Sequence, residues 1–192
     1  SYEEFKETLF KLGETPLPKW VREKVEPEDA ERYQTIFASK EGAVAAPTAG
    51  MHFSKHLFKR MEIKGIEKAF ITLHVGLGNF RTVDVEDLSK HKMDSEQFFV
   101  DEPTAEAVNK TKREGHKIVS IGTTVMRTLE TAVSTGGMIK PMEGWTNKFI
   151  FAPYEFSVAD AMVTNFQLPY STQLMMVSAF GGYDLITVSY TH

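Results

Sequence analysis

Residues 43–81 read AVAAPTAGMHFSKHLFKRMEIKGIEKAFITLHVGLGNFR, and this stretch decides the predicted fold. Its two apolar runs, residues 43–46 and 69–75, have the length and composition of buried strands. Between the two runs, Ser54 is suited to cap a helix and Gly65 to end one. A strand–helix–strand unit implies two parallel strands joined by a helical crossover. Parallel strands end at one edge of a sheet, which is where open α/β sheets bind ligands.

The rest of the chain alternates predicted helices with predicted strands. Helical periodicity over residues 2–12 is followed by a proline-containing extended link with Trp20, and a second helix is expected from Pro27. After a polar loop, the expected elements are an edge strand (97–100), a helix (104–113), a strand (117–121), a helix from 123, an aromatic strand (148–151), a short strand (161–164) and a helix (172–180).

This alternation favours a three-layer α/β/α sandwich around a largely parallel sheet. We expect residues 1–26 to form a connector helix and an extended link. Residues 27–192 are expected to form an α/β catalytic-type domain.

The composition is that of an ordinary globular domain and excludes several classes of protein. No apolar run is long enough to span a membrane, and the N-terminal residues lack the apolar core of a secretory signal, so we expect a cytoplasmic protein with no membrane partner. The absence of cysteine excludes disulfides and thiolate metal ligands. The net charge of −4 gives no overall basic field for nucleic acid. Two clusters of Lys and Arg, in residues 55–68 and 110–117, are most simply solvated helix faces.

Residues able to take part in chemistry follow four of the predicted strands. His52 and His74 are candidate acid–base catalysts because imidazole titrates near neutral pH, although either alone is more often structural. The other candidates are expected to bind substrate: Thr48, Gly50, Gly76, Gly78, Arg81, Thr123, Thr124, Arg127, Glu130 and Asn165.

Each of these candidates also has a purely structural alternative. Gly76 and Gly78 either let a ligand approach the backbone or form a tight turn. Residues 122–124 lead directly into a helix, where they either hold a carboxylate, a phosphate or ribose hydroxyls, or simply cap the helix. Arg127 and Glu130, three residues apart on that helix, form either a surface pair or a charged pair at the floor of a pocket.

Several common catalytic motifs are absent. The pattern GxGxxG is incomplete because Arg81 stands three residues beyond Gly78, so the sequence does not predict a dinucleotide site. Neither a P-loop nor a GxSxG motif is present, and no HxH or HExxH spacing supports a zinc site. A generic α/β hydrolase is therefore disfavoured.

Six longer motifs occur in one order along the chain, and together they resemble the S-adenosylmethionine:tRNA ribosyltransferase-isomerase family of queuosine biosynthesis. The resemblance covers nearly the whole chain. The motifs are GAVAAPTAGMHFS, TLHVGLGNFR, HKMDSE, IGTTVMRTLE, GWTNKFIF and TNFQLPYSTQLMMVSAFGG.

The resemblance implies an enzyme that uses S-adenosylmethionine as a ribosyl donor. It transfers and isomerises the ribosyl moiety onto 7-aminomethyl-7-deazaguanine in tRNA, giving epoxyqueuosine-tRNA, adenine and methionine, with no metal and no resident cofactor. The implied chemistry begins with removal of a proton beside the sulfonium, for which His52 or His74 is the candidate base and the substrate amine a rival. Arg81 and Arg127 are then candidates to bind the methionyl carboxylate.

The sequence also departs from the family pattern. Gln167 stands where members usually have histidine, residues 125–126 read Val-Met in place of Ser-Val, and Thr82 replaces a usual proline. Family members are much longer, with an N-terminal α/β segment and an inserted β-barrel before the point that matches Ser1, and with further residues after His192. The alternative interpretation is a paralogue or isolated domain that binds S-adenosylmethionine or tRNA without turnover.

Overall fold

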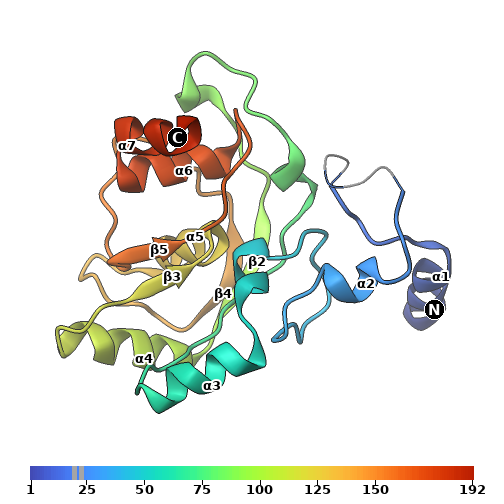
Figure 1. Cartoon of the computed structure of the whole chain (residues 1–192), viewed down its shortest axis with the longest axis horizontal. Coiled ribbons are helices and arrows are strands. Elements are labelled where there is room, and N and C mark those ends of the chain that lie inside the picture. Colours follow the sequence, from blue (N-terminus) through green and yellow to red (C-terminus); the bar gives the residue numbers. More distant parts are fainter. Residues whose placement is uncertain (19–20, 22–23) are drawn as a thin grey trace.

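The computed structural model describes residues 1–18, 21 and 24–192, and its elements follow the predicted alternation only in part (Figure 1). The helices are α1 (Tyr2–Leu12), α2 (Asp29–Arg32), α3 (Lys55–Ile63), α4 (Glu102–Arg113), α5 (Thr123–Ala132), α6 (Thr172–Gly181) and α7 (Tyr183–Thr191). The strands are β1 (Thr72–Leu73), β2 (Glu96–Val100), β3 (Val119–Ile121), β4 (Met142–Thr146) and β5 (Ala161–Val163). Three 3₁₀ turns lie between them: η1 (Thr48–His52), η2 (Leu77–Phe80) and η3 (Leu88–Lys90).

The described strands form two small sheets and confirm a mixed α/β fold. One sheet has the order β1-β2-β4 with antiparallel pairing throughout, and Phe98 of β2 lies opposite Leu73 and Gly144. The other is the parallel pair β3–β5, in which Ile121 lies opposite Val163. The expected three-layer sandwich around a largely parallel sheet is not confirmed, because two of these three pairings are antiparallel.

The strand–helix–strand unit predicted from residues 43–81 is wrong in its pairing. Residues 43–46 are irregular, although the Val44 N–H donates to the Val75 carbonyl (2.8 Å). The second apolar run contributes only β1, which pairs with β2. Consequently β2 is a central strand and not the predicted edge strand.

The aromatic strand expected at residues 148–151 is also wrong, since β4 occupies Met142–Thr146. A Cβ atom on Gly144 would lie 3.6 Å from the Phe98 ring, so a small residue faces the largest buried side chain of the sheet. Glycine within a strand weakens the sequence signal of that strand, which explains why β4 was missed.

The core gathers around α5, which packs against β3, β1, β4 and α6. Phe98, Met126 and Ile150 are among its fully buried side chains, and they come from β2, α5 and the segment after β4. In the view of Figure 1, α6 and α7 lie on one side of β3–β5, and α3 and α4 lie on the other. Asp101 and Ser171, which stand before the helices predicted at residues 104–113 and 172–180, accept the N–H groups of Thr104 and Leu174, as expected for helix starts.

The N-terminal helix α1 begins and ends as predicted. Ser1 caps it through the Glu4 N–H, and Gly13 follows its last turn. None of its residues is buried, and Figure 1 shows it to one side of the two sheets. Trp20, predicted in the extended link, lies outside the described residues, and the division into residues 1–26 and 27–192 stays a prediction. No helix in the described part of the chain has the length and apolarity needed to cross a membrane.

Candidate functional site

Two adjoining depressions open between η2, the segment before β2, α5 and α6. They share four lining residues and therefore form one continuous cleft: Asn79, Met93, Arg127 and Thr172. The first depression is also lined by Gly78, Arg81, His91, Lys92, Asp94 and Glu96. The second is also lined by Thr123, Thr124, Lys148, Phe149, Ile150, Gln173 and Met176.

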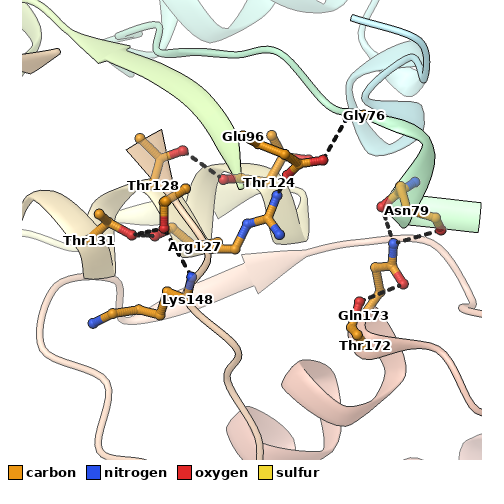
Figure 2. A network of polar contacts seen from close by, with 11 residues as sticks. Gly76, Asn79, Glu96, Thr124, Arg127, Thr128, Thr131, Lys148, Thr172 and Gln173 are labelled. Carbon is orange, nitrogen blue, oxygen red and sulfur yellow. Dashed lines mark hydrogen bonds and ion pairs between the residues drawn. The ribbon is translucent and has the colours of Figure 1, made fainter. Parts of the chain in front are cut away.

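A buried ion pair between Arg127 and Glu96, both drawn in Figure 2, lines the cleft. The Arg127 guanidinium of α5 donates to the Glu96 carboxylate at the start of β2, and the side chains are 9% and 4% exposed. The second carboxylate oxygen of Glu96 accepts the Gly76 N–H at 2.7 Å. One carboxylate thus joins α5 to the glycine turn that follows β1.

Arg127 has N–H donors that Glu96 does not use. Its Nη2 atom holds Glu96, and a guanidinium carries five N–H donors in total. Among the described residues, no buried side-chain nitrogen or oxygen lacks a partner, so the remaining guanidinium nitrogens reach the cleft surface. Burial lowers the pKa of Arg127 to about 10, which leaves the group positively charged at neutral pH.

Two contacts lie at the rim of the cleft: hydrogen bonds between α6 and η2, and a second charged pair. The Gln173 amide of α6 donates to the side-chain oxygen of Asn79 and, at 3.3 Å, to its carbonyl (Figure 2). Arg81 and Asp94 lie 3.3 Å apart and are largely exposed. Gly78 permits this arrangement, because a Cβ atom there would lie 2.5 Å from Asp94 Oδ2.

The opposite wall is the N-terminal turn of α5. Gly122 precedes it with φ +95°, a backbone conformation that favours glycine. Thr123 and Thr124 line the second depression together with Lys148. The Lys148 ammonium donates to the Glu130 carbonyl (2.6 Å) and to the Tyr154 hydroxyl (3.2 Å).

Positive charge predominates in the cleft, although the whole chain carries −4. The basic side chains that line it outnumber the acidic ones: Arg81, Lys92, Arg127 and Lys148 against Asp94 and Glu96. Carboxylate and phosphate groups are the natural partners of such an arrangement.

His52 lies at the carboxyl ends of β3 and β5, close to the start of α5. Its Nε2 atom is 2.7 Å from the Asn165 side-chain oxygen, a contact that favours the tautomer with the proton on Nε2. The η1 turn that carries Thr48, Gly50 and His52 approaches Gly122, since a Cβ atom on Gly122 would lie 3.6 Å from that of Ala49. His52, Asn165 and the start of α5 are therefore brought together, as predicted.

His74 has different surroundings. Its ring meets the Phe99 ring edge-on at 5.7 Å, and Gly42 lies against it closely enough that a Cβ atom would be 2.8 Å from Nδ1. Neither His74 nor His52 is among the residues that line the cleft, whereas His91 is. The acid–base roles of His52 and His74 stay predictions.

Glu130 differs from both predicted alternatives, because it is neither at the surface nor in the floor of the cleft. Its carboxylate is 1% exposed and accepts the N–H groups of Ser157 (2.8 Å) and Val158 (3.1 Å) and the hydroxyl of Tyr154 (3.0 Å). Glu130 and Arg127 thus have separate partners. Burial, and then the charge and hydrogen bond of Glu130, raise the pKa of Tyr154.

Glu96 and Lys148 line the cleft but are not among the residues that the sequence predicted for the site. Glu96 shares the buried face of β2 with Phe98 and Val100, but the sequence EQFFV has two consecutive phenylalanines and does not show this alternation. Lys148 carried no signal either, since it lay inside a segment predicted as an aromatic strand. In the described part of the chain, no group of three or more His, Asp or Glu side chains is placed to hold a metal ion.

The chain matches a known family. The model of the family described as queuosine biosynthesis protein matches residues 1–192, and the chain belongs to this family. The resemblance read from the six motifs is thereby confirmed.

Individual relatives carry a more specific name. The chain is 64% identical over 190 residues to an S-adenosylmethionine:tRNA ribosyltransferase-isomerase of Phocaeicola vulgatus, an alignment that covers 99% of this chain and 54% of the relative. It is 58% identical over 190 residues to the protein of the same name from Flavobacterium psychrophilum, with the same coverage. The chain thus spans about half the length of the curated relatives it matches.

A solved structure supports the fold. The crystal structure of an S-adenosylmethionine tRNA ribosyltransferase from Thermotoga maritima is 35% identical, with a TM-score of 0.58. The match covers 74% of this chain and 44% of that one.

Proposed function

We propose that this chain carries the S-adenosylmethionine-binding part of a tRNA ribosyltransferase-isomerase. The reaction transfers and isomerises the ribosyl moiety of S-adenosylmethionine onto 7-aminomethyl-7-deazaguanine in tRNA, and releases adenine and methionine. The observation that carries the proposal is the cleft: basic side chains surround a buried guanidinium beside the start of α5, in a chain whose relatives bear the enzyme's name.

The cleft suits the polar groups of S-adenosylmethionine. The free N–H groups of Arg127, with Arg81 at the rim, provide donors for the methionyl carboxylate. The hydroxyls of Thr123 and Thr124 lie on the wall of the same cleft and suit ribose hydroxyls. Met93, Phe149 and Ile150 supply an apolar surface for the adenine ring.

As the base of the reaction we propose His52, which lies beside the start of α5 but is not among the residues that line the cleft. In the tautomer that donates from Nε2 to Asn165, its Nδ1 atom accepts a proton from the carbon beside the sulfonium. The leaving adenine must accept a proton from a donor as its bond to the ribose breaks, and the substrate amine remains a rival for the role of the catalytic base. No metal or resident cofactor is needed, and the proposed location is the cytoplasm, where tRNA is available.

Release of adenine tests the proposal directly. The chain is incubated with S-adenosylmethionine and tRNA that carries 7-aminomethyl-7-deazaguanine, and free adenine is followed by chromatography. tRNA with an unmodified guanine is the matched control, and the Phocaeicola vulgatus relative runs in parallel. We expect release that depends on the modified base. If the relative releases adenine and this chain does not, the proposal fails for this chain, and binding without turnover becomes the better interpretation.

A further inference from the structure

The carboxylate of Glu96 holds together three separate parts of the cleft. It stands at the first residue of β2, accepts the Gly76 N–H beyond β1 at 2.7 Å, and pairs with Arg127 of α5 (Figure 2). Both charged side chains are at least nine-tenths buried. Neither the predicted base nor the predicted binding residues included Glu96.

Fold stability alone gives a poor explanation for a charged pair at this position. Two charges lose their hydration when they are buried, and replacing such a pair with apolar residues of similar volume is often neutral or stabilising. The next two buried residues of β2, Phe98 and Val100, are apolar and belong to the core. Glu96 is the residue of this buried face that lines the cleft. The charge is therefore placed at the cleft, beside the arginine that a ligand would meet.

The geometry explains what the charge does there. A long arginine side chain has many rotamers, and a carboxylate fixed in a β-strand restricts the guanidinium to one of them. With Nη2 engaged by Glu96, the remaining N–H groups face the cleft. The same carboxylate fixes the Gly76 N–H and so holds the start of the turn that leads to Gly78 and Arg81.

We propose that Glu96 is a positioning residue, which holds the Arg127 guanidinium and the Gly76 turn so that the free N–H groups of Arg127 bind the methionyl carboxylate of S-adenosylmethionine. The inference rests on the proposed function, because it assigns a place to one group of that substrate. Glu96 itself does not touch the substrate. Its effect is exerted through Arg127 and Gly76.

A comparison of two ligands isolates this effect from general damage to the fold. Calorimetric titration measures the affinity of the chain for S-adenosylmethionine and for its decarboxylated analogue, which lacks only the carboxylate. A charge-assisted hydrogen bond of about 1.5–3 kcal/mol corresponds to a preference of about tenfold or more for the carboxylate-bearing ligand in the native chain. In Glu96→Gln, where an amide faces the guanidinium, we expect this preference to fall to about twofold or less. In Glu143→Gln, an exposed carboxylate on the neighbouring strand β4, the native preference should persist.

A second variant covers the case in which Glu96→Gln does not fold. Arg127→Lys keeps the buried charge beside Glu96 but lacks the planar fork of donors, so it should lose most of the carboxylate preference while thermal unfolding shows a folded protein. Unchanged preference in Glu96→Gln or in Arg127→Lys overturns the positioning role. A native chain that binds both ligands equally overturns the carboxylate assignment alone. A native chain that binds neither ligand and releases no adenine overturns the proposed function, and this inference with it.

Discussion

Replacing Glu130 by alanine should destabilise the protein strongly without touching the cleft. The carboxylate is 1% exposed and is the acceptor for the Ser157 N–H, the Val158 N–H and the Tyr154 hydroxyl. In Glu130→Ala all three donors lose this acceptor at once. The Lys148 ammonium keeps its bond to the main-chain carbonyl of residue 130.

The magnitude follows from these three contacts. A hydrogen bond to a charged group contributes about 1.5–3 kcal/mol, and a buried donor without an acceptor costs about 1–3 kcal/mol. Water can reach Ser157, which is exposed, and part of Tyr154, so their share is smaller than that of buried Val158. We therefore expect a loss of about 3–5 kcal/mol in the free energy of unfolding for Glu130→Ala. Glu130→Gln keeps an oxygen for the two N–H groups and should lose only about 1–2 kcal/mol.

Thermal and urea unfolding of the two variants check this reasoning. For a domain of this size, the loss in Glu130→Ala corresponds to a fall of roughly 6–20 °C in Tm. Glu143→Gln, which changes an exposed carboxylate, should stay within about 0.5 kcal/mol of the native chain. If Glu130→Ala lies within about 1 kcal/mol of the native chain, or if glutamine is as damaging as alanine, the three hydrogen bonds do not stabilise the fold as argued.

Two further predictions concern pH and the rim of the cleft. Because the folded state raises the pKa of Tyr154, the unfolded chain loses this proton first as pH rises. The contribution of the Tyr154 proton to the free energy of unfolding is therefore complete below about pH 10, the pKa of an unfolded tyrosine, and declines above that pH. Urea unfolding at several alkaline pH values should show this decline in the native chain and a smaller decline in Tyr154→Phe. Gly78→Ala would place a Cβ atom 2.5 Å from Asp94 Oδ2 and should displace that carboxylate from Arg81. We expect several-fold weaker binding of S-adenosylmethionine with Tm changed by little. Gly136→Ala, at an exposed site where a Cβ atom would meet Ser134 Oγ at an ordinary 3.9 Å, should change neither binding nor Tm. Unaltered binding in Gly78→Ala would show that the rim pair plays no part.

The sequence predicted helices better than strands, for physical reasons visible in particular residues. Asp101, Ser171 and Gly13 are local signals for helix ends, and α1, α4 and α6 begin and end within about two residues of the predictions. Strand pairing depends on distant partners, which no local pattern encodes. The apolar run at residues 69–75 is indeed a buried segment, but whether it pairs with residues 43–46 or with β2 is decided by tertiary packing.

Several residues of the candidate site were predicted individually, but their arrangement in one cleft around a buried carboxylate was not. Gly78, Arg81, Thr123, Thr124 and Arg127 do line one cleft. The Glu96 carboxylate was not predicted as part of the site because the expected strand began at residue 97, one residue later. A register that starts at 96 puts the charge on the buried face, and a buried carboxylate requires a partner.

The small size of the two sheets has a consequence for how the protein unfolds. A two-stranded and a three-stranded sheet of such short strands have little stability by themselves, and α5 packs against both. We therefore expect the two sheets to melt in one cooperative transition, with no half of the molecule surviving limited proteolysis. The cleft is lined by residues of α5, which packs against strands of both sheets, so a ligand bound there raises the free energy of unfolding of both sheets together.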